Sequence, residues 1–306
     1  MASLLLLLVT AFVSSCGGRS QQYSIAWERN GTLLVSGSDL GLVRCSASGD
    51  VLERLLAPQW DIDGLAVADS ELGPVIAFSA RKGGPKVANG EVASEVYFLR
   101  VGSKAPERVT TNSTADKVLV GDVGPSVWVQ TYSAAPPSLL MSAWIPQGVR
   151  RIRLFTGKPE VIVHARAPGT DLVAGGRHQE LGVILCDRWP MGEGSLVLDY
   201  DGRVQMSHCS WLEVTPAGSV GVDAFREAGR SGEAVVFQRS GSNQKLSIQR
   251  FYDHRVPYAP RVSPDGEHIA WIVKDAQYSE RDHQLWIADL VAETTRAVPL
   301  GSSFLR

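Results

Sequence analysis

Two short segments pair carboxylates in a way that could support chemistry, Asp61-Ile62-Asp63-Gly64 and Asp199-Tyr200-Asp201-Gly202. Residues two apart in a strand point to the same face, so each segment could present two carboxylates together. Calcium coordination and glycoside hydrolysis both need grouped carboxylates. Neither segment continues into a complete calcium-binding loop. We therefore expect aspartates beside a turn glycine, with a carboxylate site as the alternative.

Other catalytic and cofactor motifs are absent from the sequence. No Gly-x-Ser-x-Gly elbow of a serine hydrolase occurs, and neither a Walker loop nor a Gly-x-Gly-x-x-Gly fingerprint leads into a helix. No Cys-x-x-Cys is present, and the histidines never fall at metal-ligand spacing; they are His164, His178, His208, His254, His268 and His283. We therefore expect no catalytic residue, no cofactor and no metal, and a protein that is not an enzyme.

The charge of the chain is almost balanced. It has 30 Lys and Arg against 32 Asp and Glu, a net charge of −2, which does not favour nucleic acid as a partner. One basic cluster lies at Arg150, Arg151, Arg153 and Lys158. Because Ile152 and Leu154 alternate with Arg151 and Arg153, we expect the solvated face of an outer strand. A patch for an anionic ligand or partner is the alternative.

The N-terminus has the pattern of an export signal. The apolar run from Leu4 to Val13 is too short to span a bilayer, which needs about 20 residues. The sequence Val13-Ser14-Ser15-Cys16 resembles the bacterial lipobox, in which the cysteine is acylated and becomes the first residue of the mature chain. An ordinary signal peptide cleaved near Ser15 is the alternative.

The lipobox resemblance implies three parts of the chain. Residues 1–15 would be a signal peptide, residues 16–22 a short linker from the lipidated Cys16, and residues 23–306 a single domain. The acyl chains, palmitate among them, would anchor the protein to a membrane. Gly17 is not the aspartate associated with inner-membrane retention, so the resemblance implies the outer membrane. We expect an outer-membrane or periplasmic location rather than the surface of a single-membrane cell.

Three further cysteines follow Cys16, namely Cys45, Cys186 and Cys209. An exported protein meets an oxidising environment, where cysteines pair. We expect a Cys186–Cys209 disulfide because these two lie closest in the sequence. Three buried thiols that act as small apolar side chains are the alternative.

The elements that must position these residues are strands. From Tyr23 onward, short apolar or alternating runs are broken every eight to twelve residues by Gly, Pro, Asn, Asp or Ser, and runs with helical period are missing. Roughly six units recur at a spacing of about 40 to 50 residues, which is typical of propeller blades. We expect an all-β propeller of six blades, each with four antiparallel strands, and tryptophans that fill the space between stacked blades.

One segment carries a family resemblance. It runs from Pro260 to Trp271, is followed by Gln284 to Leu290, and contains the turn Ser263-Pro264-Asp265-Gly266. This pattern resembles the TolB-type, WD40-like β-propeller repeat. We expect the turn to join an outer strand to an inner one, because proline fixes φ and glycine tolerates a positive φ. In the following inner strand, alternate residues on both faces are apolar, as neighbouring blades on both sides require; they are Ile269, Trp271 and Val273 on one face, and Ala270 and Ile272 on the other.

These observations favour a non-enzymatic lipoprotein of the cell envelope. It would bind an envelope protein or glycan through loops on one propeller face, such as Arg81 to Gly90, or through the mouth of the central channel. A propeller hydrolase or lactonase is one alternative, and it predicts carboxylates or histidines at the starts of inner strands. A structural envelope component is another, and it predicts an uncharged, filled channel.

Overall fold

The computed structural model describes most of the chain between Tyr23 and Phe304. The residues it describes are 23–70, 73–81, 93–100, 102–110, 115–121, 126–134, 144–155, 159–164, 172–173, 177–178, 182–187, 195–198, 204–207, 211–252, 254–275, 283–300 and 304. Within these ranges the chain forms six antiparallel sheets, five with four strands and one with five. We refer to the sheets as blades 1 to 6 in chain order.

The first three blades each have four strands in sequence order. Blade 1 contains β1 (Tyr23–Trp27), β2 (Leu33–Gly37), β3 (Gly41–Cys45) and β4 (Val51–Leu56). Blade 2 contains β5 (Ile62–Ser70), β6 (Gly73–Ala80), β7 (Glu95–Arg100) and β8 (Glu107–Arg108), and a short 3-10 helix, η1 (Pro58–Trp60), precedes it. Blade 3 contains β9 (Ala115–Gly121), β10 (Ser126–Ala134), β11 (Trp144–Arg153) and β12 (Pro159–His164).

The last three blades complete the chain. Blade 4 contains β13 (Leu172–Val173), β14 (Arg177–His178), β15 (Gly182–Asp187), β16 (Ser195–Leu198) and β17 (Val204–Ser207), with both β13 and β14 paired to β15. Blade 5 contains β18 (Trp211–Thr215), β19 (Gly218–Glu227), β20 (Arg230–Arg239) and β21 (Lys245–Tyr252). Blade 6 contains β22 (Arg255–Val262), β23 (His268–Asp275), β24 (His283–Asp289) and β25 (Thr294–Pro299).

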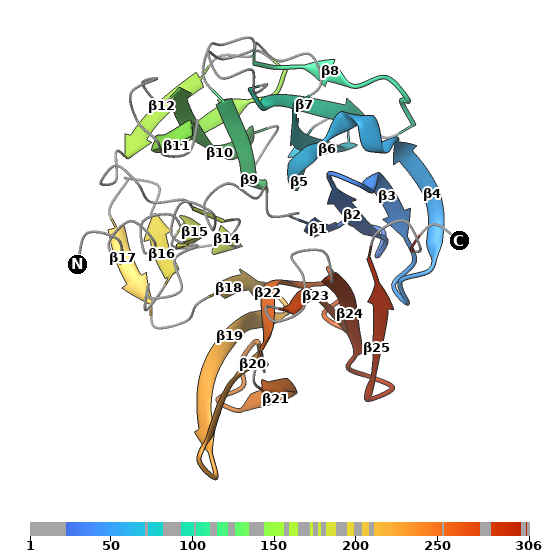
Figure 1. Ribbon diagram of the computed structural model, residues 1–306, viewed down its shortest axis with the longest axis vertical. Coiled ribbons are helices and arrows are strands. Elements are labelled where there is room, and N and C mark those ends of the chain that lie inside the picture. The colour runs from blue at the N-terminus through green and yellow to red at the C-terminus, as the bar shows by residue number, and fades with distance from the viewer. Residues whose placement is uncertain are drawn as a thin grey trace, which may run out of the picture.

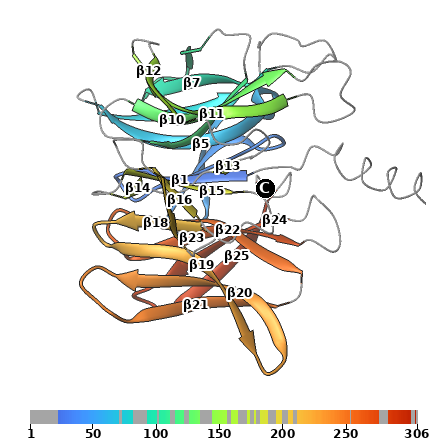
Figure 2. The same cartoon turned by 90° about the vertical axis from the view of Figure 1, so that its left-hand side faces the viewer.

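The blades are arranged as a ring. Figure 1 shows them around a common centre, and Figure 2 shows the same ring from the side. The first strands contact one another across blade boundaries, β1 with β5, β5 with β9, β14 with β18, β18 with β22, and β22 with β1. First strands therefore lie at the centre of the ring and the later strands lie outward. This is a β-propeller, and the all-β expectation is confirmed.

Apolar side chains on both faces of the middle strands hold neighbouring blades together. In β23, Ile269, Trp271 and Val273 pack into a cluster shared with blade 5, whereas Ala270 and Ile272 pack into a cluster shared with blade 1. The division of this strand into two apolar faces is thus confirmed. Several tryptophans fill such layers, since Trp27, Trp128 and Trp271 are buried.

The Ser-Pro-Asp-Gly turn forms as expected, but it joins different strands. Ser263 Oγ donates to Asp265 Oδ1 at 2.5 Å, and the amide of His268 donates to Ser263 Oγ at 2.9 Å. Gly266 has φ of +74°, and a Cβ there would lie 2.6 Å from Ala217 Cβ in the matching turn of blade 5. The turn connects β22, nearest the centre, to β23. We expected the turn to lead from an outer strand to an inner one, and this was wrong, because it leads from the first strand of the blade to the second.

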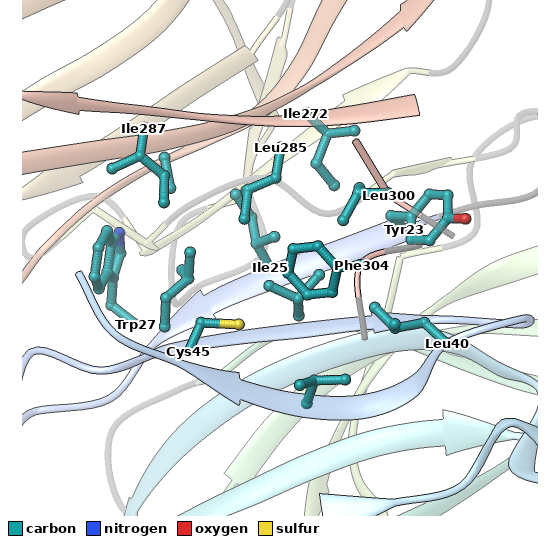
Figure 3. Close-up of a cluster of buried hydrophobic side chains, with 14 residues drawn as sticks. Tyr23, Ile25, Trp27, Leu40, Cys45, Ile272, Leu285, Ile287, Leu300 and Phe304 are labelled. Atoms are coloured by element: carbon teal, nitrogen blue, oxygen red, sulfur yellow. The ribbon is translucent and has the colours of Figure 1, made fainter. Parts of the chain in front are cut away.

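Ring closure uses side chains rather than a shared strand. Among the described residues, blade 1 is built from the start of the chain and blade 6 from its end, with no strand exchanged. We call the boundary between these two blades the seam. Figure 3 shows its apolar cluster, in which β1 and β3 of blade 1 meet β23 and β24 of blade 6. The indole Nε1 of Trp27 also donates to the carbonyl of Arg261 at 3.1 Å, and Arg296 pairs with Asp50 at 2.9 Å.

Candidate functional site

The predicted carboxylates Asp61 and Asp63 share one arginine, Arg81. Arg81 Nη1 lies 3.2 Å from Asp61 Oδ2, and Arg81 Nη2 lies 3.0 Å from Asp63 Oδ2. The hydroxyls of Ser79 and Ser94 donate to the other oxygen of Asp63 at 2.6 and 3.0 Å. Because Asp63 is bound through both oxygens, the pair favours a structural role over calcium coordination.

A second buried ion pair corrects the interpretation of the basic cluster. Arg150 Nη2 lies 2.5 Å from Asp116 Oδ2, and Thr131 Oγ1 donates to Asp116 Oδ1 at 3.0 Å. Burial raises the pKa of the Asp116 carboxyl more than Arg150 and the hydrogen bonds of Thr131 and Thr110 lower it. The arginines of the basic cluster lie on β11, which is the third strand of blade 3. Of the described basic residues on β11, Arg153 is exposed, whereas Arg150 and Arg151 are partly buried. The solvated outer strand was thus a wrong expectation for Arg150.

These two clusters fasten blade 2 to blade 3. The amide of Val118 donates to Ser79 Oγ at 3.0 Å, and the amide of Asp116 donates to the carbonyl of Ser94 at 2.8 Å. Between them the backbones approach so closely that a Cβ at Gly64 would lie 2.3 Å from the carbonyl oxygen of Val118. Carboxylates do lie near the starts of β5 and β9, as an enzyme in the ring centre predicts. Their hydrogen-bonding capacity is used within the protein.

A third polar cluster lies at the ring centre and is held more loosely. It joins Glu213 on β18 to Arg261 and Val262 on β22. Glu213 Oε2 accepts a hydrogen bond from the Val262 amide at 2.7 Å, while Glu213 Oε1 lies 3.9 Å from Arg261 Nε. That separation is too long for a hydrogen bond. Solvent still reaches both side chains, whose exposed fractions are 16% for Glu213 and 9% for Arg261.

The backbone of β22 explains why these groups meet. β22 is the first strand of blade 6, so one of its edges has no neighbour within the sheet. Glu213 from blade 5 satisfies the Val262 amide on this edge, and Trp27 from blade 1 satisfies the carbonyl of Arg261. Between Tyr258 and Arg261 the register slips by one residue, and Ala259 has φ of +52°. A bulge of this kind redirects the side chain that follows it.

Burial raises the pKa of the Glu213 carboxyl, and the nearby Arg261 and the Val262 amide offset only part of that rise. A carboxyl with a raised pKa can donate a proton nearer to neutral pH than an ordinary glutamate. A carboxyl and a guanidinium therefore lie on the first strands of blades 5 and 6, while the expectation of an uncharged, filled channel stays a prediction.

Sequence reasoning missed this cluster. Glu213 and Arg261 belong to different blades, and although Arg261 lies in the segment with the repeat resemblance, no role was expected for it. A signal existed, since apolar residues flank each charge: Leu212 and Val214 flank Glu213, and Pro260 and Val262 flank Arg261. Charges at such positions are rarely buried without a partner.

Several predicted sites lie outside the described residues. These are Cys16, Lys158, Cys209, the segment 199–202 and positions 82–90 of the predicted loop, so the lipidation and the Cys186–Cys209 disulfide stay predictions. Cys45 is a free, buried thiol, and burial raises its pKa to about 12. Within the described ranges there is no cluster of three or more metal-ligating side chains. Nor does that part of the chain contain a helix long and apolar enough to cross a membrane.

Comparison with known proteins finds the fold but no sequence relative. No protein-family model and no curated protein matches the chain. An oligogalacturonate lyase in complex with manganese matches with a TM-score of 0.51 and 12% identity, over 89% of this chain and 75% of that one. An oligogalacturonate lyase from Vibrio parahaemolyticus matches with a TM-score of 0.49 and 9% identity, over 90% and 76%. A protein described as TolB from Agrobacterium tumefaciens matches with a TM-score of 0.35 and 14% identity, over 92% and 82%.

These matches correct one expectation. The conclusion that the chain is not an enzyme was drawn from the absence of hydrolase and nucleotide motifs. A solved structure with a similar fold is an oligogalacturonate lyase, which is an enzyme. Missing motifs are therefore no evidence against catalysis in this fold, and the expectation was wrong. Function must instead be argued from the residues of the site.

Proposed function

We propose that this protein is an enzyme that cleaves a carbon–oxygen bond by acid–base catalysis at the centre of the ring. Glu213 is the catalytic residue. Its protonated carboxyl donates a proton to the oxygen that leaves, a water molecule adds to the carbon left behind, and the proton that this water loses returns to Glu213. The observation that supports this proposal is that the two carboxyl oxygens of Glu213 have different surroundings. One oxygen is anchored at 2.7 Å by the Val262 amide, and the other faces Arg261 at 3.9 Å with solvent access.

The contrast with the carboxylates on the first strands of blades 2 and 3 supports Glu213. Asp63 and Asp116 are each bound by an arginine and by hydroxyl groups, so a substrate would have to displace those partners first. Glu213 keeps one oxygen available, and burial already raises its pKa. Carboxyl groups that act as general acids in hydrolysis are tuned by burial in the same way.

The substrate class is proposed to be an oligosaccharide or a sugar lactone. Both contain a carbon–oxygen bond whose cleavage is assisted by a proton on the leaving oxygen. Oligogalacturonate belongs in the test panel because a structure with the same fold is named for it. Neutral oligosaccharides and aldonolactones complete the panel, and products are followed by mass spectrometry.

The decisive variant is Glu213→Gln. It keeps the acceptor for the Val262 amide but cannot transfer a proton, so we expect turnover to fall by about 100-fold or more. Glu53→Gln is the matched control, because Glu53 is exposed on the outer strand β4 and pairs only at the surface with Arg44. If Glu213→Gln turns over the substrate as fast as the Glu53→Gln control, Glu213 is not the catalytic residue.

The cellular setting is proposed separately. The lipobox resemblance supports an exported protein acylated at Cys16, of the TolB-type repeat class, facing a glycan or protein of the envelope. Metabolic labelling with palmitate tests it. Label on the full chain that disappears in Cys16→Ser is the expected result, and equal labelling of both would contradict it.

A further inference from the structure

We infer that Arg261 is an oxyanion-binding residue that holds the carboxylate of a sugar acid at the centre of the ring. This inference rests on the proposed function and narrows its substrate class. It assigns Arg261 a contact with the substrate, whereas Glu213 has the proton-transfer role.

The first argument is that most donors of Arg261 are open to a ligand. A guanidinium has five N–H donors. The whole residue is 8% exposed, and its one hydrogen bond within the described part of the chain runs from Nη1 to the carbonyl of Pro260 at 3.2 Å. None of its remaining donor atoms is among the buried atoms that lack a partner, so solvent reaches them. The nearest carboxylate oxygen, Glu213 Oε1, lies 3.9 Å from Nε.

A second arginine in the same protein shows what a satisfied site looks like. Arg44, 19% exposed, binds the buried Glu28 through both Nε at 2.6 Å and Nη2 at 2.9 Å, and binds Glu53 through Nη1 at 2.9 Å. Arg261 is more deeply buried and has no such fork-to-carboxylate pairing. Arg261 leaves donors that no described residue binds, and these are open to an oxyanion from outside the protein.

The backbone around Arg261 is fixed in advance. Its carbonyl accepts a hydrogen bond from Trp27, and the next amide, of Val262, donates to Glu213, so two neighbouring blades restrain the residue. Two positions earlier, Ala259 has φ of +52°, a conformation that costs a non-glycine residue on the order of 1 kcal/mol. Strained backbone next to a polar side chain is common where a ligand must be held in one geometry.

The chemistry of the fork favours a carboxylate. The planar guanidinium matches a planar carboxylate through two parallel hydrogen bonds, and the pairing is stronger in a site that excludes water. Glu213 lies on the Nε side of Arg261, so a bound sugar acid would bring its own bonds within reach of the Glu213 carboxyl. Binding and proton transfer would then occur at adjacent atoms. Inorganic phosphate shares the oxyanion chemistry and must be distinguished by experiment.

Isothermal titration calorimetry on the full chain tests the inference. We expect galacturonate or glucuronate to bind at millimolar concentration, whereas galactose and glucose, which lack the carboxylate, do not. Arg261→Gln should weaken binding at least about tenfold, and Arg296→Gln, which removes an exposed arginine of the same blade, should leave it unchanged. If Arg261→Gln does not fold, Arg261→Lys keeps the charge without the fork and should still lose about tenfold.

Three results would overturn the inference. These are no binding by either sugar acid, equal binding by the neutral sugars, and phosphate binding in place of the sugar acids. Glu213→Gln separates the two proposals, because it should keep sugar-acid binding while turnover is lost. Binding without turnover in the wild type would refute the enzyme and leave the Arg261 site in place.

Discussion

Replacing Leu285 by alanine tests whether the seam depends on side-chain packing. Leu285 is fully buried in the cluster between blade 1 and blade 6, where Figure 3 shows it beside Ile25 and Phe304. The substitution removes three carbons, or about 2.4 kcal/mol at roughly 0.8 kcal/mol per carbon. The cavity adds to this cost, so we expect the free energy of unfolding to fall by about 3 kcal/mol.

The assay combines global and local measurements. Urea denaturation gives the change in the free energy of unfolding, and the melting temperature should fall by roughly 6 °C. Hydrogen exchange shows where the protein opens. Because no strand crosses the seam in the described residues, exchange should rise in β1 and in β22 to β25 before it rises elsewhere.

Leu99→Ala is the matched control. Leu99 is 2% exposed and lies on β7, the third strand of blade 2, just as Leu285 lies on the third strand of blade 6. Leu99 differs in its place, because it packs between blades 1 and 2 and not at the seam. The control should lose similar stability without opening the seam. The reasoning is refuted if Leu285→Ala costs less than about 1 kcal/mol, or if both variants give the same exchange pattern.

Three further outcomes are expected. Burial raises the pKa of Glu213, so the folded wild type loses stability as the pH rises through the pKa of the folded state. Glu213→Gln should therefore be more stable relative to the wild type at about pH 8 than below about pH 4, as measured by urea denaturation at both pH values. Gly64→Ala should cost about 3 kcal/mol, since the new Cβ would lie 2.3 Å from the Val118 carbonyl oxygen and would push β5 from β9; an unchanged melting temperature would contradict that close approach. Ser263→Ala leaves the amide of His268 without its 2.9 Å acceptor and should lower the free energy of unfolding by about 1.5 kcal/mol, measured by chemical denaturation, and no loss would mean that the turn is held by other contacts.

The strands of blade 1 and the turn of blade 6 could be predicted because their signals are local. The turn signals Asn30-Gly31 and Gly49-Asp50 lie where the observed β1 joins β2 and β3 joins β4. The alternation in β23 likewise identified both packed faces. In blade 3, the alternating residues Arg151 to Leu154, expected on an outer strand, lie at the end of the third strand, β11, and just after it.

Ion pairs between strands of one blade were beyond the same signals. Arg81 could be assigned to an exposed loop because its partners, Asp61 and Asp63, lie at the start of a different strand, β5. Arg150 was grouped with the exposed arginines, yet it lies two residues before Ile152, on the same face, and reaches Asp116 on β9. A charge on a strand is buried or solvated according to what the neighbouring strands offer, and periodicity does not identify those neighbours.

The sequence by itself therefore determined that this protein is a ring of small antiparallel sheets, because turn residues and two-faced apolar strands act over a few positions. Only the tertiary structure decided which polar residues meet. Glu213 and Arg261 become neighbours because the free edge of β22 needs hydrogen-bond partners from the blades on both sides. The candidate site is a consequence of ring closure, which no single blade specifies.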